Sequence, residues 1–126
     1  KRGVDRGGMR VAILILALLS LGMDFNHLAD SIYLSEGGKK ASKPFGILSV
    51  PCEGYDSCRH ICLNTLRNTH RKWLQLPQDR RSDYLSYLAS VYAPIGARND
   101  PRGLNKNWLR LVKYFYNKNN SLDRIL

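Results

Sequence analysis

Residues 25–38 read FNHLADSIYLSEGG, and this stretch predicts the first helix of the folded part of the chain. Its apolar side chains recur every three or four positions, which is the spacing of one helix face. These apolar positions are Phe25, Leu28, Ala29, Ile32 and Tyr33. The paired glycines 37 and 38 then end the helix. Glu36 therefore stands at the end of an apolar helix, where the helix dipole disfavours a carboxylate.

Glu36 is a candidate general acid because of this placement. The chain contains one other glutamate, Glu53. Partial desolvation by the helix would raise the pKa of the Glu36 carboxyl, as a general acid near neutral pH requires. The alternative is a solvated glutamate at a helix end, and the pattern alone leaves both interpretations open.

Three further helices are expected downstream. They cover about 56–76, 80–91 and 105–116, with Asp56 or Ser57, Ser82 and Asn105 as candidate N-caps. The expected inner face of the first of them carries Cys58, Ile61, Cys62, Thr65, Thr69 and Trp73. Residues 45–50 (FGILSV) can form a brief β-strand, and residues 117–126 are expected to fray. The fold class is therefore all-α, mainly helical, with one possible short β element after the first helix.

The first 22 residues have the pattern of an export signal. Four basic residues precede an apolar run of 13 residues, Val11 to Met23. A membrane-spanning helix needs about 20 apolar residues, whereas a secretory signal needs fewer. Ser20 and Gly22 offer small side chains for cleavage after Gly22. We expect export to the periplasm or cell envelope, with membrane contact only through an uncleaved signal. The alternatives are a buried N-terminal helix and an uncleaved anchor.

Length and charge limit the remaining possibilities. The chain has 126 residues, which corresponds to one folded domain, over 23–126, after the signal-like segment. This is too short for a Rossmann enzyme, a TIM barrel or a kinase. Twenty Lys and Arg residues stand against ten Asp and Glu residues, for a net charge of +10. Such a charge predicts a polyanionic partner, which can be nucleic acid, an anionic membrane or an anionic polymer such as a cell wall.

Three cysteines favour a disulfide over a metal site. Cys52, Cys58 and Cys62 are too few and too closely spaced for a four-ligand zinc site, so no metal is expected. In an oxidising compartment Cys52 can pair with either of the other two. Cys58 and Cys62 lie one helical turn apart, which disfavours a bridge between them.

Five segments in order resemble one enzyme family. Residues 29–38 (ADSIYLSEGG) resemble an apolar helix that ends in a catalytic Glu, and 43–49 (KPFGILS) resemble an aromatic-Gly-apolar-apolar-Gln turn that forms a cleft floor. Residues 61–65, 90–94 and 105–116 fall where the same family has a polar pair, a Tyr-Asn-Ala-Gly motif and a closing helix. From Leu28 to Tyr116 the chain is thus similar to the lysozyme-like lytic transglycosylases of the SLT type. Residues 92–108 also resemble the C-terminal part of wall-lytic glucosaminidase-like proteins, which act on peptidoglycan as well.

The resemblance implies a compact lysozyme-like catalytic domain over 23–126 that cuts the MurNAc-GlcNAc β-1,4 bond of peptidoglycan. Glu36 would protonate the glycosidic oxygen and then take the proton of the sugar's own C6 hydroxyl, giving a 1,6-anhydro product. The implied substrate-binding residues are Ser49, Asn64, Thr65 and Tyr92. No metal or cofactor is implied, and we expect a monomer whose partners are peptidoglycan glycan strands and not nucleic acid.

Departures from the family motifs support other functions. Ser49 stands where the second motif has Gln, Ala93 and Pro94 replace Asn-Ala, and Gly37 replaces Ser. Glu36 and Tyr92 are kept, so the changes affect substrate positioning more than proton transfer. The altered second and third motifs support the alternative, a catalytically inactive lysozyme-like protein that binds the wall or assists assembly. A lysozyme-type hydrolase would need a second carboxylate. The candidates for that role are Glu53, Asp56 and Asp100.

A basic nucleic-acid-binding module is a third possibility, opposed by the signal-like start. Its basic residues would include Arg67, Arg71, Lys72, Arg80, Arg81, Arg102, Lys106 and Arg110. Single candidate residues also have structural alternatives. Tyr92 can be a packing aromatic, and Asn64 and Thr65 can be ordinary helix residues. The lysines at 39, 40 and 43 would favour an anionic wall polymer, but they can also belong to a solvated loop. Core packing is favoured over sugar stacking for Trp73 and Trp108.

Overall fold

The computed structural model describes residues 23–125, with side chains as far as Lys118. Within this range the chain forms four α-helices and four short 3₁₀ turns, and no β-strand. The helices are α2 (Phe25–Ser35), α3 (Gly54–Leu74), α4 (Tyr84–Tyr92) and α5 (Trp108–Ile125). The all-α class is therefore confirmed. The signal-like segment 1–22 lies outside the described residues.

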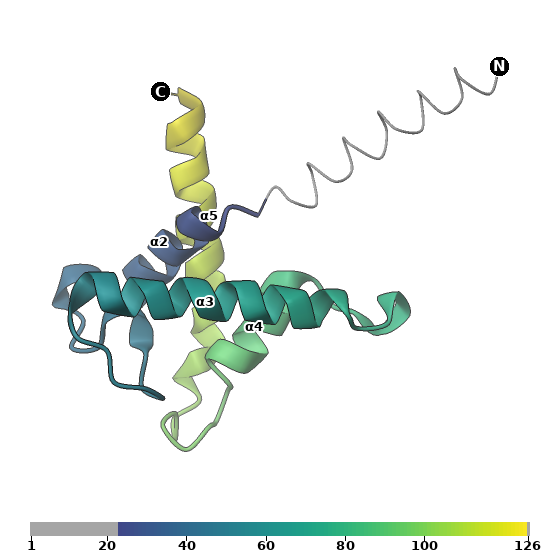
Figure 1. Ribbon diagram of the computed structural model, residues 1–126, viewed down its shortest axis with the longest axis horizontal. Helices are drawn as coiled ribbons and strands as arrows, with labels where there is room; N and C mark the ends of the chain where they lie inside the picture. The colour runs from purple at the N-terminus through teal and green to yellow at the C-terminus, as the bar shows by residue number, and fades with distance from the viewer. Residues whose placement is uncertain (1–22, 126) are drawn as a thin grey trace.

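Two long helices organise the molecule (Figure 1). The 21-residue helix α3 runs across the front, and α5 crosses behind it. Both α2 and α4 contact α3 as well as α5, so each short helix is held by both long ones. No helix among residues 23–125 is long and apolar enough to cross a membrane.

The expected β-strand over 45–50 is wrong. Residues Pro44–Gly46 form the 3₁₀ turn η2, closed by a hydrogen bond from the Gly46 amide to the Lys43 carbonyl, and irregular chain follows. A strand needs a partner strand, and none lies within the described residues. Phe45 and Ile47 are nevertheless buried, because alternate side chains anchor this loop to the core.

Several helix ends also differ from expectation. Helix α3 begins at Gly54, before the expected caps, and α5 begins at Trp108 after the 3₁₀ turn η4 (Leu104–Asn107). The cap of α4 is Asp83 rather than Ser82, because the Asp83 carboxylate accepts the amide hydrogen of Ser86. The tail expected to fray continues as helix through Ile125.

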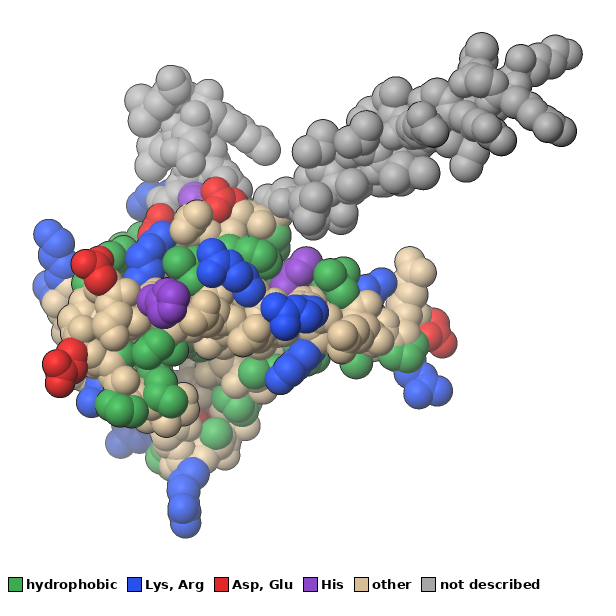
Figure 2. All heavy atoms as spheres, viewed as in Figure 1, with side chains coloured by type: hydrophobic (Ala, Val, Ile, Leu, Met, Phe, Trp, Pro, Cys, Tyr) green, Lys and Arg blue, Asp and Glu red, His purple; other side chains and the backbone are tan. Residues whose placement is uncertain are grey.

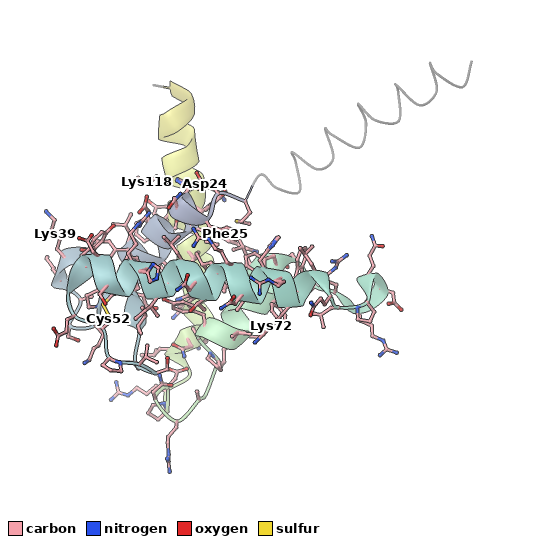
Figure 3. All side chains as sticks on the ribbon, in the orientation of Figure 1. Asp24, Phe25, Lys39, Cys52, Lys72 and Lys118 are labelled. Carbon is pink, nitrogen blue, oxygen red and sulfur yellow. A yellow bond between two sulfur atoms is a disulfide. The ribbon has the colours of Figure 1, made fainter. Side chains whose placement is uncertain are left out.

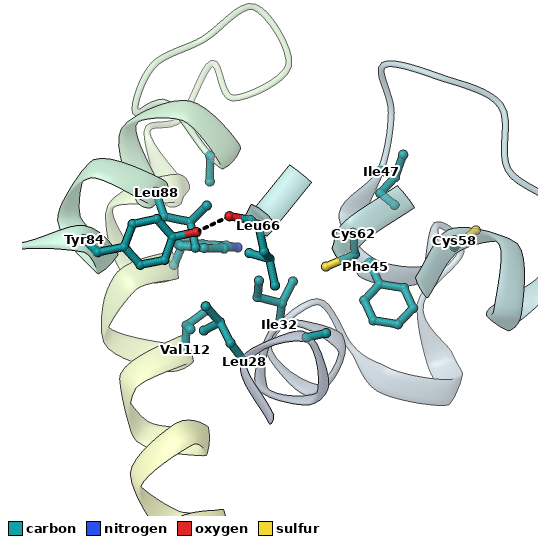
Figure 4. Packing of buried hydrophobic residues seen from close by; sticks show 13 residues of the cluster. Leu28, Ile32, Phe45, Ile47, Cys58, Cys62, Leu66, Tyr84, Leu88 and Val112 are labelled. Atoms are coloured by element: carbon teal, nitrogen blue, oxygen red, sulfur yellow. Dashed lines mark hydrogen bonds between the residues drawn. The ribbon is translucent and has the colours of Figure 1, made fainter. Parts of the chain in front are cut away.

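The core lies where the four helices and η2 meet (Figure 4). Its fully buried apolar members are Leu28, Ala29, Ile32, Phe45, Cys58, Cys62, Leu66, Leu88 and Val112. The expected inner face of α3 is confirmed for Cys58, Cys62 and Thr69, whereas Ile61, Thr65 and Trp73 are only partly buried. Tyr84 donates a hydrogen bond of 3.0 Å to the Leu66 carbonyl, which satisfies its hydroxyl inside this core.

A disulfide joins Cys52 to Cys58. This is one of the two pairings expected from the sequence. It ties the irregular chain after η2 to the first turns of α3 and leaves Cys62 as a free, buried thiol.

Candidate active site around Glu36

Glu36 caps the C-terminus of α2. The Glu36 backbone N–H donates to the Ile32 carbonyl, and the N–H of Gly37 donates to the Leu34 carbonyl. Gly37 has a φ of 108°. Only glycine adopts this left-handed conformation readily, so the chain can turn away sharply at this point. The turn leaves the Glu36 side chain at the edge of the core, half-buried.

The carboxyl group of Glu36 is held from two sides. The indole Nε1 of Trp108, at the start of α5, donates a hydrogen bond of 2.8 Å to Oε1. On the other side the backbone of Gly46 in η2 comes so close that a Cβ atom there would lie 2.5 Å from the carboxyl carbon. A side chain at position 46 would therefore displace the carboxyl group.

Tyr92 supports this arrangement from the end of α4. Its ring stacks on that of Trp108, with centroids 5.2 Å apart and planes 24° apart. Its hydroxyl donates a hydrogen bond to the carbonyl oxygen of Phe45. Phe45 has a φ of 62°, unusual for a residue with a side chain, and this conformation brings Gly46 next to Glu36. Tyr92 thus links η2 to the tryptophan that holds the acid.

An open hollow of about 280 Å³ lies in front of the carboxyl group. Glu36 is its one carboxylate, and the other lining residues are Ala41, Ser42, Lys43, Gly46, Leu48, Tyr92, Ala93, Asn99 and Asn105. A second hollow of about 280 Å³ shares Gly46, Leu48, Tyr92 and Asn99 with the first. The two hollows form a groove of mixed polar and apolar lining, as an extended, hydroxyl-rich ligand would need.

The predicted binding residues are only partly brought together. Tyr92 lines both hollows, and Ser49 and Thr65 line the second. The Thr65 hydroxyl is already engaged, since it donates to the Ile61 carbonyl at 3.0 Å. Asn64 is exposed on α3 with its amide 3.3 Å from the His60 ring, and it lines neither hollow.

Sequence reasoning missed the role of Trp108. Core packing was the favoured interpretation, and the residue is indeed 5 % exposed. A buried indole N–H needs an acceptor, so a polar partner for Trp108 could have been expected, but not which residue supplies it. Asn99 and Asn105 also line the hollow, and no feature of the sequence predicts this.

Burial raises the pKa of Glu36 above its usual value, and the hydrogen bond from Trp108 opposes this in part. Nearby groups do not compete for the proton, because burial raises the pKa of the Cys62 thiol to about 11 and also raises that of Tyr92. Of these three groups, Glu36 is thus the one best suited to donate a proton and take it back.

The candidates for a second carboxylate line neither hollow. Glu53 and Asp56 are exposed at the start of α3. Asp100 is buried, and its carboxylate accepts hydrogen bonds from the backbone amides of three residues of its own loop, Gly96, Leu104 and Asn105. Its desolvation acts to raise its pKa, but these three bonds keep it below the usual value. Among the described residues no group of three His, Cys, Asp or Glu side chains is placed to hold a metal ion.

No protein-family model matches the chain, and comparisons with curated proteins and with solved structures also give no match. The lysozyme-like arrangement implied by the motif resemblance therefore stays a prediction. Any function assigned to the chain depends on that resemblance and on the geometry around Glu36.

Proposed function

We propose that this chain is a lytic transglycosylase that cleaves the MurNAc-GlcNAc β-1,4 bond of peptidoglycan, with Glu36 as its single acid and base. The observation that carries the proposal is the half-buried Glu36 carboxyl, held by Trp108 and Gly46 at the floor of an open groove. Its raised pKa suits a group that must first donate a proton and then accept one.

The geometry supports a division of labour between the two carboxyl oxygens. Oε1 accepts the Trp108 hydrogen bond, so proton transfer falls to Oε2. Oε2 donates its proton to the glycosidic oxygen as the bond to C1 of the muramic acid breaks. The resulting carboxylate accepts the proton of the C6 hydroxyl, whose oxygen then bonds to C1 and closes the 1,6-anhydro ring. The proton lost by Glu36 in the first step returns to it in the second.

The lining of the groove fits a sugar strand. Ser42, Asn99 and Asn105 offer hydroxyl and amide groups for sugar hydroxyls, and Lys43 offers a cation for the carboxylates of peptide-bearing muramic acid. The proposal places the protein outside the cytoplasm, in the periplasm or cell envelope, since its substrate is found there.

A hydrolase that uses two carboxylates is the weaker proposal. Retaining and inverting glycosidases place their two carboxyl groups roughly 5–10 Å apart across the scissile bond. Glu36 is the one carboxylate that lines the two hollows described above. An attacking hydroxyl supplied by the substrate itself, as in the transglycosylase reaction, needs no second carboxylate in the groove.

Digestion of purified peptidoglycan, followed by mass spectrometry of the fragments, tests the proposal. We expect fragments that end in 1,6-anhydro-N-acetylmuramic acid, and none from the variant Glu36→Gln. The glutamine keeps the shape of the side chain and can accept the Trp108 hydrogen bond, but it has no proton to donate. Glu53→Gln, a change at an exposed glutamate outside the groove, is the matched control and should cut normally.

The other outcomes contradict the proposal in different ways. Reducing ends would mean that water attacks, as in a hydrolase. Absence of fragments from a folded protein that sediments with the wall would instead support the inactive wall-binding function. Normal cutting by Glu36→Gln would remove Glu36 from the mechanism.

A further inference from the structure

The C-terminal end of α3 and the turn that follows it project from the rest of the molecule (Figure 1). We call residues 71–81 the α3 tip. It comprises the last turn of α3, the residues around Pro77 and the 3₁₀ turn η3 (Gln78–Arg80). None of its residues lines the groove at Glu36.

The α3 tip and the helix that leads into it are strongly basic. No Asp or Glu occurs from residue 57 to residue 78. Figure 2 shows basic side chains over the C-terminal half of α3. The exposed or partly exposed cations are Arg67, Arg71, Lys72, Arg80 and Arg81, and Asp79 is the one acid among them. Burial lowers the pKa of His70, which disfavours the charged form of this histidine.

Two leucines are exposed among these cations. The exposed fractions of the Leu74 and Leu76 side chains are 54 % and 38 %. Pro77, the next residue, is also exposed. Exposed single leucines are common on protein surfaces, but two at a projecting turn flanked by cations combine the apolar and cationic groups that contact with a membrane surface uses.

The α3 tip is held in this shape before any partner binds. Trp73 donates its indole hydrogen to the Ser82 carbonyl at 2.7 Å, and the Arg81 guanidinium lies 4.7 Å from the centre of the Trp73 ring. The Leu76 amide bonds to the Trp73 carbonyl at 3.1 Å. The leucines are therefore presented by a fixed turn, and little conformational freedom is lost on docking.

We propose that the α3 tip docks the folded domain onto an anionic lipid bilayer. The arginine and lysine side chains would lie at the lipid phosphates, while Leu74 and Leu76 would enter the boundary between headgroups and acyl chains. A soluble polyanion such as nucleic acid would satisfy the cations but would leave the leucines in water. This contact is made by the folded domain itself, separately from any signal segment, and it does not depend on the activity of Glu36.

Docking in this way leaves the groove open. The groove uses Ile61 and Thr65 from the middle of α3. At a rise of 1.5 Å per helical residue, Leu74 lies roughly 14 Å further along the axis than Thr65. A bilayer at the α3 tip would therefore not cover Glu36.

The test is co-sedimentation of the full chain with vesicles of equal parts phosphatidylcholine and phosphatidylglycerol. Each variant is compared with the unchanged chain on the same vesicles, so that any contribution of residues 1–22 cancels. We expect the double variant Arg71→Gln/Lys72→Gln to partition about 30-fold more weakly, because each lost cation weakens binding about fivefold. Lys39→Gln/Lys40→Gln removes the same charge and is the matched control. Figure 3 shows Lys39 and Lys72 in opposite halves of the molecule, so the control should change binding far less.

The leucines separate a bilayer from other polyanions. We expect Leu74→Ser/Leu76→Ser to weaken vesicle binding about tenfold and to leave the retention of the chain on duplex DNA unchanged. If Leu74→Ser/Leu76→Ser binds vesicles as tightly as the unchanged chain does, the proposal is overturned and the surface is purely electrostatic. Equal loss in the Lys39/Lys40 and Arg71/Lys72 variants, or tighter binding to DNA than to vesicles at the same salt, would overturn it as well.

Discussion

The carboxyl group of Glu36 depends on a residue 72 positions further along the chain, Trp108. The glutamate itself could be predicted from its place at the end of an apolar helix before two glycines. Its partner could not, because nothing in the local pattern around Trp108 shows which acceptor its buried N–H will find. At this scale the sequence indicates which residue is unusual, and the structure shows what holds it.

Replacing Trp108 by Phe should move the pH profile of the proposed reaction. The hydrogen bond stabilises the charged form of Glu36 and so lowers its pKa, and without it the pKa rises further. Glu36 donates only when protonated, so activity is lost as the pH rises through this pKa. We therefore expect the alkaline limb of kcat/KM to shift to higher pH, and kcat to fall about tenfold because the carboxyl is less well oriented.

Rates of glycan cleavage across the pH range would measure both effects. Trp73→Phe is the control, because the Trp73 indole also donates a hydrogen bond but does so at the α3 tip, to the Ser82 carbonyl. An alkaline limb at the same pH in Trp108→Phe and the unchanged chain would show that the bond does not tune the acid.

Gly46→Ala should remove activity, whereas Gly96→Ala should not. Both glycines have a positive φ, 67° and 72°, so both substitutions carry a similar backbone strain of about 1 kcal/mol. An added Cβ at Gly46 would meet the Glu36 carboxyl at 2.5 Å, whereas nothing lies within 4 Å of one at Gly96. We expect at least a roughly 100-fold loss of cleavage for Gly46→Ala alone.

Unfolding by urea should show that both glycine variants fold, with the larger stability loss in Gly46→Ala, because displacement of the Glu36 carboxyl adds to the backbone strain that both share. Full activity in Gly46→Ala would mean that the carboxyl can move without consequence for the reaction.

At the scale of elements, the loop over residues 42–53 lines one side of the groove through its residues 42–49, with no strand to stabilise it. Phe45 and Ile47 anchor it to the core, and the Cys52–Cys58 disulfide anchors its far end to α3. The positions of the helices follow from apolar periodicity, but the strand expected over 45–50 does not form. Burial of every second side chain is found in a strand, and it is also found in a loop that is anchored to the core at alternate residues. Only the presence of a partner strand would distinguish the strand from the loop.

Cys52→Ser should destabilise the protein and loosen this loop. The bridge closes a short loop, with a sequence separation of 6, and on the chain-entropy model its loss costs about 2 kcal/mol. Because Ser49 and Leu48 lie on the same loop and line the groove, we expect KM to rise more than kcat falls.

Urea unfolding with and without reductant checks the stability effect. Reductant should lower the stability of the unchanged chain to that of Cys52→Ser and leave the variant unaffected. A reductant-sensitive Cys52→Ser variant would show that a different disulfide forms.

At the scale of the whole molecule, the excess of positive charge is largely uncompensated. The chain carries a net charge of +10, and among the described side chains one ion pair forms within 4 Å, Arg59 with Asp30 at 2.6 Å. The charge could be read from composition. Its gathering on α3 and at the α3 tip depends on which helix faces are left exposed.

Moderate salt should therefore stabilise the protein. Screening weakens the repulsion among the cations, so we expect Tm to rise by about 2–5 °C between low ionic strength and 0.15 M sodium chloride. Calorimetry or circular dichroism at fixed pH measures the shift, and chloride is preferred because sulfate also acts by exclusion from the surface. A Tm that falls with salt would mean that attractive pairs outweigh the repulsion.

The helices, their apolar faces and the unusual position of Glu36 follow from the amino-acid sequence, because periodicity, caps and paired glycines act within a few residues of one another. The bond from Trp108 to Glu36, the link from Tyr92 to Phe45, the choice of Cys58 as partner for Cys52 and the groove itself were decided by the tertiary structure. Most of these features join residues far apart in the sequence. Their pairing depends on how α3 and α5 cross and on where the loop over residues 42–53 is anchored. Neither the crossing nor the anchoring can be recognised from a pattern of neighbouring residues in the sequence.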